Sequence, residues 1–420
     1  MQIINPATEE AVREMSEDTA VTLQGKFDKL KTAQPAWNAL SLGERVSIIK
    51  KYSSLLEKNI ESLAAVLTSE VGKPLQQSRN EINGSRSRIQ WMVDNAVKYL
   101  SDETMSDTAG LAERISYEPL GVVANISAWN YPYLVGTNVF IPALLAGNAV
   151  MYKPSEYSTL TGLEIQKLLY EAGVPKDVFH VAVGGKQVGD LLLDMPMDGY
   201  FFTGSYRTGK YIYEKVAPKM VPCQCELGGK DPLYVADDVA DIKSVAAATA
   251  DGAFYNNGQS CCAVERIYVN EKVYDQYVEE FVKEVKSYKT GLPTEEGVYI
   301  GPLTRREQLE VLEEQVEEAV NNGATLNAGG KRREGKGFYF EPTVLTNVNH
   351  HMGVMQDESF GPIIGIMKVK DDEEAIKLMG DTEYGLTASV YSASQHRAES
   401  ILRQLNVGTG YWNCCDRVSA

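Results

Sequence analysis

Short apolar runs alternate with an amphipathic segment between residues 120 and 205, and this alternation limits the folds open to the chain. The four runs that we expect as buried strands are GVVANISAW, NAVMYKPS, VFHVAVGG and GYFFTGS. Between the second and third runs, TLTGLEIQKLLYEAGVP has helical spacing and ends at Gly173 and Pro175. Strands joined by crossover helices form a parallel sheet, so the pattern predicts an α/β fold.

A second alternation begins near residue 228 and predicts a second α/β domain. A small-residue helix, a strand and an amphipathic helix follow one another in DIKSVAAATADGAFYNNG, ERIYVNE and EKVYDQYVEEFVKEVKSY. Ahead of the first strands, residues 19–99 carry apolar residues at helical spacing, and we expect long helices there. Helices thus precede two successive α/β units.

Residues 102–118 belong to neither predicted core. The segment MSDTAGLAERISYEP alternates polar and apolar residues, which is typical of an exposed β arm. Unpaired strand edges are suited to pairing with another chain, so this arm is a candidate contact between subunits. The chain is therefore divided into residues 1–101 with 119–227, the arm at 102–118, and residues 228–420.

The net charge and the composition limit the classes of partner that the protein can bind. The 420 residues include 41 Lys and Arg against 57 Asp and Glu, and the net charge of −16 argues against binding to nucleic acid or an anionic membrane. The start of the chain has no basic region followed by an apolar run, and no window approaches 18 consecutive apolar residues. We expect no signal peptide, no membrane span and a cytoplasmic location.

The cysteines and histidines do not form a metal-binding pattern. The six cysteines fall in three close pairs without zinc-ribbon spacing, and the four histidines lie far from those pairs in sequence. We expect reduced cysteines and no metal site.

The stretch NNGQSCCAVERIYV places two adjacent cysteines on a turn between a helix and a strand. A buried thiol is ordinarily an inert small hydrophobe, so a structural role is the first interpretation of Cys261. Its place at the end of an element favours a functional role, because functional side chains concentrate at such turns. A nucleophile would need partners elsewhere in the chain.

Two polar residues at the ends of apolar strands are candidate partners. Glu226 is followed closely by two glycines, which would let another group approach the backbone, although a surface glutamate is the alternative. Asn130 could donate its side-chain amide to an oxyanion or serve ordinary turn chemistry. The residues by themselves leave these alternatives open.

Five motifs occur in one order along the chain, and together they resemble the aldehyde dehydrogenase superfamily. The motifs are SAWNYPYLVGTNVFIPALLAGNAVMYKPSE, FTGSYRTG, ELGGKDP, NNGQSCCAVER and QDESFGP. The resemblance runs from INPATEE near the start to GTGYWN near the end. It implies a Rossmann-like cofactor-binding domain at 1–101 and 119–227, an oligomerisation arm, and a second α/β, catalytic domain at 228–420.

The resemblance implies three catalytic residues. The family's nucleophile is the Cys of Gly-Gln-x-Cys, here Cys261, with Cys262 as the fallback. The Glu that opens Glu-Leu-Gly-Gly is the general base, here Glu226, and a partly buried carboxylate would suit that task. Asn130 completes the oxyanion hole with the backbone N–H of Cys261. The implied reaction is NAD(P)-dependent oxidation of an aldehyde to an acid through a thiohemiacetal and a thioester.

The resemblance also implies a cofactor site. Glu358 and Phe360 match the residues beside the nicotinamide ribose and ring, Lys153 and Glu156 match the contacts to the adenosine ribose, and residues 204–209 match the pyrophosphate turn. Glu156 favours NAD, because a carboxylate can bond the ribose 2′-OH and repels a 2′-phosphate, and NADP is left open. The full set is Trp129, Lys153, Ser155, Glu156, Gly204, Ser205, Gly209, Leu227, Glu358 and Phe360.

The end of the chain departs from the family pattern. The family continues beyond residues 416–420 through a loop, a helix and a strand that pairs with a neighbouring subunit. We therefore expect a homo-oligomer, a dimer or tetramer, that is weakened by the short C-terminus.

The sequence leaves the aldehyde and two alternative functions open. The apolar wall YPYLVGTN favours neutral aldehydes, and Asn138 stands where relatives acting on succinate semialdehyde carry an Arg. One alternative is a CoA-acylating dehydrogenase, which Glu226 disfavours. The other is a catalytically impaired, truncated relative that acts as a binding or structural protein, which the intact set of Asn130, Glu226 and Cys261 disfavours.

Overall fold

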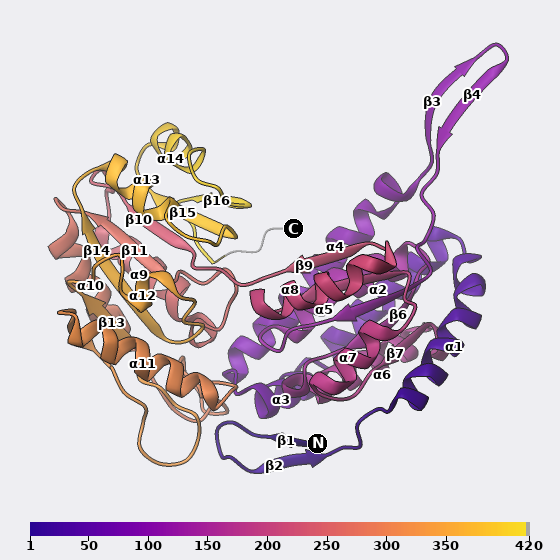
Figure 1. Cartoon of the computed structure of the whole chain (residues 1–420), viewed down its shortest axis with the longest axis horizontal. Coiled ribbons are helices and arrows are strands. Elements are labelled where there is room, and N and C mark those ends of the chain that lie inside the picture. Colours follow the sequence, from indigo (N-terminus) through magenta and orange to yellow (C-terminus); the bar gives the residue numbers. More distant parts are fainter. Residues whose placement is uncertain (417–420) are drawn as a thin grey trace.

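The molecule has two lobes, each built on a mainly parallel sheet (Figure 1). The computed structural model describes residues 1–416. The first lobe holds a five-stranded parallel sheet in the order β7-β6-β5-β8-β9. Its strands are β5 Val122–Ile126, β6 Ala149–Lys153, β7 Phe179–Val181, β8 Gly199–Thr203 and β9 Cys223–Glu226. The four apolar runs of the sequence are thus confirmed as β5 to β8.

The strand order of this sheet reverses beside β5. The chain builds outward from β5 to β6 and β7 on one side, and to β8 and β9 on the other. In doubly wound sheets, ligands bind at the carboxyl ends of the strands at such a reversal. The order therefore points to the loops that follow β5 and β8.

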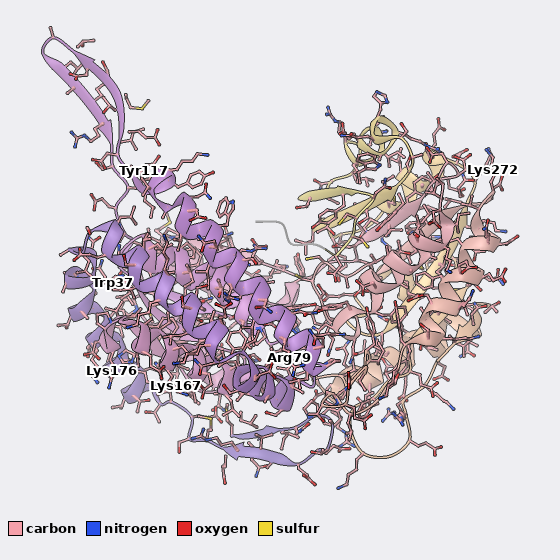
Figure 2. The ribbon with its side chains drawn as sticks, turned by 180° about the vertical axis from the view of Figure 1, so that it is seen from behind. Trp37, Arg79, Tyr117, Lys167, Lys176 and Lys272 are labelled. Carbon is pink, nitrogen blue, oxygen red and sulfur yellow. The ribbon has the colours of Figure 1, made fainter. Side chains whose placement is uncertain are left out.

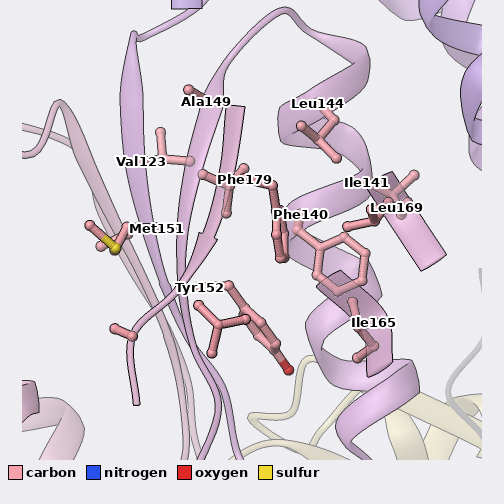
Figure 3. Close-up of a cluster of buried hydrophobic side chains, with 14 of the residues drawn as sticks. Val123, Phe140, Ile141, Leu144, Ala149, Met151, Tyr152, Ile165, Leu169 and Phe179 are labelled. Atoms are coloured by element: carbon pink, nitrogen blue, oxygen red, sulfur yellow. The ribbon is translucent and has the colours of Figure 1, made fainter. Parts of the chain in front are cut away.

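Helices pack against the first sheet and bury its apolar side chains. Phe140 from the helix after β5 lies edge-on to Tyr152 of β6 and to Phe179 of β7, with ring centroids 5.6 Å apart in both pairs (Figure 3). Burial of each large apolar side chain contributes roughly 1.5–3 kcal/mol. The helices are α1 Ala20–Asn38, α2 Leu42–Lys58, α3 Ile60–Val71, α4 Leu75–Leu100, α5 Pro132–Leu145, α6 Thr159–Ala172, α7 Lys186–Asp194 and α8 Tyr206–Val216, with 3₁₀ turns η1 Glu156–Ser158, η2 Lys176–Val178 and η3 Ala217–Lys219.

The second lobe holds a seven-stranded sheet in the order β12-β13-β14-β11-β10-β15-β16, antiparallel only between β12 and β13. The strands are β10 Pro232–Val235, β11 Arg266–Asn270, β12 Thr325–Ala328, β13 Thr343–Thr346, β14 Ile363–Val369, β15 Thr387–Tyr391 and β16 Thr409–Trp412. The helices are α9 Ile242–Phe254, η4 Tyr255–Gly258, α10 Tyr274–Ser287, α11 Glu307–Asn321, α12 Gly353–Gln356, α13 Asp372–Gly380 and α14 Gln395–Leu402. Because β11 and β14 are adjacent and parallel, the loops that enter them lie side by side.

Two short antiparallel ribbons stand outside the sheets. β1 (Gln2–Ile4) pairs with β2 (Ala11–Glu14), and β3 (Glu103–Thr108) pairs with β4 (Leu111–Ile115). The β3–β4 ribbon projects away from the first lobe (Figure 1), and nearly all of its residues are exposed. It falls within the predicted arm at 102–118, whereas the β1–β2 ribbon was not predicted.

Candidate functional site

Several of the sequence-predicted cofactor residues lie at the carboxyl ends of the parallel strands in the first lobe. Trp129 follows β5, Ser155 follows β6 and Ser205 follows β8. Ser205 caps α8, where its hydroxyl accepts a hydrogen bond from the backbone N–H of Thr208 at 3.4 Å. The N-terminus of a helix of this length offers backbone N–H groups to a phosphate. The donor set therefore fits a dinucleotide laid across these strand ends.

A cleft of about 1200 Å³ lies between the two lobes. Glu226 at the end of β9 and the adjacent thiols of Cys261 and Cys262 all line it. A carboxylate from the first lobe and a thiol from the second thus face one cavity, as a two-step thioester mechanism requires.

A sharp reversal of the backbone presents the thiols to this cleft. Asn256, Asn257 and Gly258 all have left-handed φ angles, of 53°, 58° and 67°. Asn tolerates this conformation better than most residues do, and a Cβ at Gly258 would lie 2.4 Å from the carbonyl oxygen of Gly361. The turn is held from the first lobe, because the backbone N–H of Asn256 donates to Oε1 of Gln77 at 3.1 Å.

The two thiols differ in exposure. Their sulfur atoms are 3.6 Å apart, but Cys261 is half-buried whereas Cys262 is 5% exposed. The hydrogen bond with Cys261 and burial raise the pKa of Cys262, so Cys262 keeps its proton. Cys261 is therefore the better placed nucleophile of the pair.

Asn130 is buried next to the turn that carries Cys261. Its side-chain Nδ2 donates to the carbonyl oxygen of Gln259 at 3.1 Å, two residues before Cys261. An amide nitrogen carries two hydrogens, so one remains for an oxyanion at the thiol. The structure thus brings Asn130 to the cysteine turn, although it is not among the residues that line the cleft.

Glu226 is exposed, so the expectation of a partly buried carboxylate is wrong. It lies on β9, the edge strand of the first sheet, and its Oε1 accepts a hydrogen bond from Nε2 of Gln224 at 3.2 Å. The backbone around it is tightly fixed, because its carbonyl oxygen accepts from the N–H of Gly204 at 3.0 Å. A Cβ at Gly209 would lie only 2.4 Å from the Leu227 side chain. The predicted pyrophosphate turn therefore packs closely against the residue that follows Glu226.

The loop before β14 reaches across to the first lobe. The rings of Phe360 and Trp129 meet edge to face with centroids 5.5 Å apart. Oε1 of Glu358 accepts from the backbone N–H of Gly229 at 3.2 Å, and a Cβ at Gly228 would collide with this carboxylate. Burial and the neighbouring carboxylate of Glu265 raise the pKa of Glu358 to about 7. These predicted residues therefore meet where the lobes join.

The residues after β6 form a separate group. Lys153 is buried, its Nζ donates to the carbonyl oxygen of Pro154 at 3.3 Å, and burial lowers its pKa despite the nearby Glu156. Glu156 is half-buried and its Oε2 accepts from the hydroxyl of Ser155 at 3.1 Å. The ammonium of Lys153 can donate to a ribose hydroxyl and the carboxylate of Glu156 can accept from one.

Two buried ion pairs support the site, and sequence reasoning missed both. The ammonium of Lys230 donates to Glu265 at 2.8 Å, and the two oxygens of Glu265 accept from the backbone N–H groups of Ser359 (3.0 Å) and Phe360 (2.9 Å). Phe360 has a left-handed φ of 46°, which is unusual for an aromatic residue and is held by these bonds. The lysine in the motif ELGGKDP, Lys230, is the sequence feature that could have pointed to this ion pair.

The second pair lies beneath Asn130. Lys73 and Glu81 are hydrogen-bonded and their side chains are 0% exposed. Lys73 Nζ donates to the carbonyl oxygen of Asn130 at 2.7 Å, and Glu81 Oε1 accepts from the backbone N–H of Tyr133 at 2.8 Å. The ammonium also lies 3.7 Å from the centre of the Tyr131 ring. The pair thus holds the chain on both sides of Tyr131.

Within residues 1–416, no group of three or more His, Cys, Asp and Glu side chains is arranged to hold a metal ion. Over the same residues, every helix is too short or too polar to cross a membrane. The end of the chain, on which the expectation of a weakened oligomer rests, lies outside the described residues except for Asp416.

The molecule is a two-lobed, doubly wound α/β protein with a thiol in the cleft between its lobes. Its sequence matches the Aldehyde dehydrogenase family over residues 1–420. Lactaldehyde dehydrogenase of Escherichia coli (strain K12) is 33% identical over 416 residues, which cover 98% of this chain and 87% of that protein. The chain therefore belongs to the aldehyde dehydrogenase family.

Solved structures agree with this assignment. An E. coli NADP dependent enzyme superposes with a TM-score of 0.95 at 31% identity, covering 100% of this chain and 87% of that one. An indole-3-acetaldehyde dehydrogenase complexed with NAD+ gives a TM-score of 0.96 at 31% identity, covering 100% and 86%. The predicted family, α/β fold class and enzyme class, an NAD(P)-dependent aldehyde dehydrogenase, are confirmed. The domain boundaries and the roles of individual residues stay predictions.

Proposed function

We propose that this chain oxidises an aldehyde to the carboxylic acid with NAD(P)+, through a thioester on Cys261. The single observation that supports this most is the cleft itself, which is lined by the thiol of Cys261 and the carboxylate of Glu226 from opposite lobes. The predicted cofactor residues at the ends of β5, β6 and β8 complete the set on the first lobe. The catalytic domain would then be residues 228–420 and the cofactor domain residues 1–101 with 119–227.

In the first step, Cys261 would lose its proton to water, and the thiolate sulfur would attack the carbonyl carbon and give a thiohemiacetal oxyanion. The Asn130 amide, held at Gln259 O by its Nδ2, and the backbone N–H of Cys261 would donate to that oxygen. Loss of one such donor costs about 3–4 kcal/mol in other enzymes. Burial of Cys262 keeps the second thiol out of this step.

A bound NAD(P)+ would supply the hydride acceptor, and loss of hydride from the thiohemiacetal carbon would leave a thioester on Cys261. The edge-on contact of Trp129 with Phe360 and the carboxylate of Glu358 would hold the nicotinamide end at the junction of the lobes. Water then attacks the thioester carbon, Glu226 takes the proton from that water, and the carboxylic acid leaves as the thiol reforms.

NAD is the preferred cofactor in this proposal. Glu156 and Lys153 stand at the end of β6, where an adenosine ribose would lie, and Glu156 is half-buried. A carboxylate there accepts from a free 2′-OH and repels a 2′-phosphate. Relatives of both kinds exist, since the solved structures above include an NADP dependent enzyme and a complex with NAD+.

Replacement of Glu226 by Gln is expected to slow hydrolysis of the thioester far more than its formation. An amide cannot take the proton from water, so turnover should fall by on the order of 10²–10⁴-fold. The measurement is rapid-mixing absorbance of the reduced cofactor in the absence of CoA, where a burst should appear before slow turnover. Loss of the burst together with turnover would show that Glu226 acts on the thiol instead. Acid formation by the wild type without CoA would contradict the CoA-acylating alternative.

We also propose that the β3–β4 ribbon is a contact between subunits of a homo-oligomer. Met105, Leu111 and Ile115 are 61%, 56% and 42% exposed on this ribbon, and Tyr117 at its base is 46% exposed (Figure 2). Replacement of residues 103–115 by a short Gly-Ser linker should lower the molar mass measured by light scattering at micromolar concentration. The melting temperature of the lobes should change little, because the ribbon buries almost nothing. An unchanged molar mass would contradict this role.

A further inference from the structure

An arginine from the second lobe reaches over the turn that carries Glu156. The guanidinium carbon of Arg305 lies 6.0 Å from the centre of the Tyr157 ring, and the guanidinium donates a hydrogen bond to the Tyr157 hydroxyl. Tyr157 follows Glu156 directly in η1, and its ring meets that of Trp129 edge to face at 6.5 Å. A cation from the second lobe therefore stands beside first-lobe residues that are assigned to the cofactor.

The backbone before Arg305 is held in place from two sides. Thr304 is 3% exposed, and its hydroxyl donates to the carbonyl oxygen of Val71 on α3 at 2.6 Å. The backbone N–H of Thr304 donates to Oε1 of Gln259, in the turn before the thiols, at 3.0 Å. Arg305 thus projects from a defined position, although it lies on a loop.

The guanidinium has more donors than its protein partners use. It carries five N–H groups in a planar fork and stays protonated in proteins. Its Nε is buried, and none of residues 1–416 gives it a hydrogen-bond partner. A carboxylate oxygen of Glu307 lies 3.9 Å from Nε, which is too far for a hydrogen bond, and the Glu307 side chain is 66% exposed. The Nε–H is therefore a buried donor suited to an acceptor that the protein itself does not supply.

The charges of the predicted cofactor residues leave a place for this cation. These residues include one cation, Lys153, and two carboxylates, Glu156 and Glu358. The ammonium of Lys153 is buried and already donates to the carbonyl oxygen of Pro154. A phosphate on the adenosine ribose would be repelled by Glu156, and a further cation is needed to offset that repulsion.

We propose that Arg305 binds the 2′-phosphate of NADP, so that this chain binds NADP as well as NAD. This inference rests on the proposed cofactor site at the end of β6. A guanidinium can give a phosphate two parallel N–H···O bonds, whereas the 2′-OH of NAD carries no charge and is accepted by Glu156. The choice of cofactor is then set by one residue from each lobe, Glu156 and Arg305.

The test is titration calorimetry of the full chain with NAD+ or NADP+ in the absence of an aldehyde. The wild type is expected to bind both cofactors, with a Kd for NADP+ within about tenfold of that for NAD+. Arg305→Met should raise the Kd for NADP+ roughly 10- to 100-fold, as expected for loss of charge-assisted hydrogen bonds, and change the Kd for NAD+ less than about twofold. Arg305→Lys, which keeps the charge without the fork, should restore part of the loss.

Glu156→Gln tests the opposing charge. An amide does not repel a phosphate, so this variant should bind NADP+ more tightly than the wild type and NAD+ more weakly. NADP+ affinity is thus expected to move in opposite directions when Arg305 and Glu156 are replaced singly. An NADP+ affinity that falls in both variants would contradict the proposed balance.

The matched control is Arg306→Met, at the next residue. Arg306 is exposed and lies 3.7 Å from Glu9 in the β1–β2 ribbon, so both Kd values should be unchanged. Failure of the wild type to bind NADP+ would overturn the assignment, and so would an equal loss of both cofactors, or an unchanged NADP+ affinity, in Arg305→Met. Binding of both cofactors without reduction by any aldehyde would instead contradict the oxidation at Cys261 and leave the role of Arg305 standing.

Discussion

Replacement of Cys261 by Ser is expected to abolish aldehyde-dependent reduction of NAD(P)+ while the cofactor still binds. A hydroxyl is a far weaker nucleophile than a thiolate at neutral pH, and the neighbouring thiol of Cys262 is only 5% exposed. Loss of the nucleophile in other enzymes slows turnover by about 10⁶-fold, so the remaining activity should fall below detection. Cofactor binding should survive, because the predicted cofactor residues lie at the strand ends of the first lobe and in the loop before β14.

Cys262→Ser is the matched control for this experiment. Cys262 is 5% exposed and its sulfur lies 3.6 Å from that of Cys261, so its loss should change packing slightly and leave most of the activity. Steady-state kinetics report the activity of both variants, and quenching of intrinsic fluorescence by NAD+ reports cofactor binding. An inactive Cys262→Ser beside an active Cys261→Ser would reverse the assignment of the nucleophile.

The strands were predictable because a buried parallel strand is a continuous apolar run. All five residues of β5 and all five of β6 are buried, which is the pattern that the sequence shows. The break at Asn59 between α2 and α3 could not be predicted, because the apolar periodicity of the sequence continues across it. The β1–β2 ribbon was missed for the opposite reason: only Ile3 in it is buried, so it carries almost no apolar signal.

The site was predictable only as far as motifs fix residue types at the ends of elements. Glu226 stands where its motif predicts, but its exposure follows from β9 lying at the edge of the sheet, which depends on strand order. The partner of Lys230 is Glu265, on the loop before the neighbouring strand β11, and their contact requires the pairing of β10 with β11. Such supporting contacts arise from tertiary structure and leave no local pattern.

The pair of Lys73 and Glu81 is the supporting contact whose loss should cost most. Both side chains are 0% exposed, and burial lowers the pKa of Lys73 and raises that of Glu81, so each depends on the other for its charge. Removal of one partner leaves a buried unpaired charge, and such changes destabilise proteins by about 3–5 kcal/mol. Lys73→Met also removes the donor to the carbonyl of Asn130, so the rate of thioester formation should fall together with the stability.

Arg79→Met provides the comparison on α4, the helix that carries Glu81. Arg79 pairs with Glu61 at 2.7 Å on the surface (Figure 2), where a pair contributes only about 0–1 kcal/mol. Thermal unfolding followed by circular dichroism should therefore show a melting temperature lowered by about 3–6 °C in Lys73→Met and barely changed in Arg79→Met.

The double variant Lys73→Met with Glu81→Met separates stability from positioning. Replacement of a whole buried pair by apolar residues often restores stability, so its melting temperature should recover toward that of the wild type. The carbonyl of Asn130 still lacks the ammonium in this variant, and Asn256 Nδ2 at 3.3 Å is then the nearest donor left to hold it. Activity that stays low after stability returns would show that the pair positions Asn130. Activity that recovers together with stability would reduce the pair to a structural element of the first lobe.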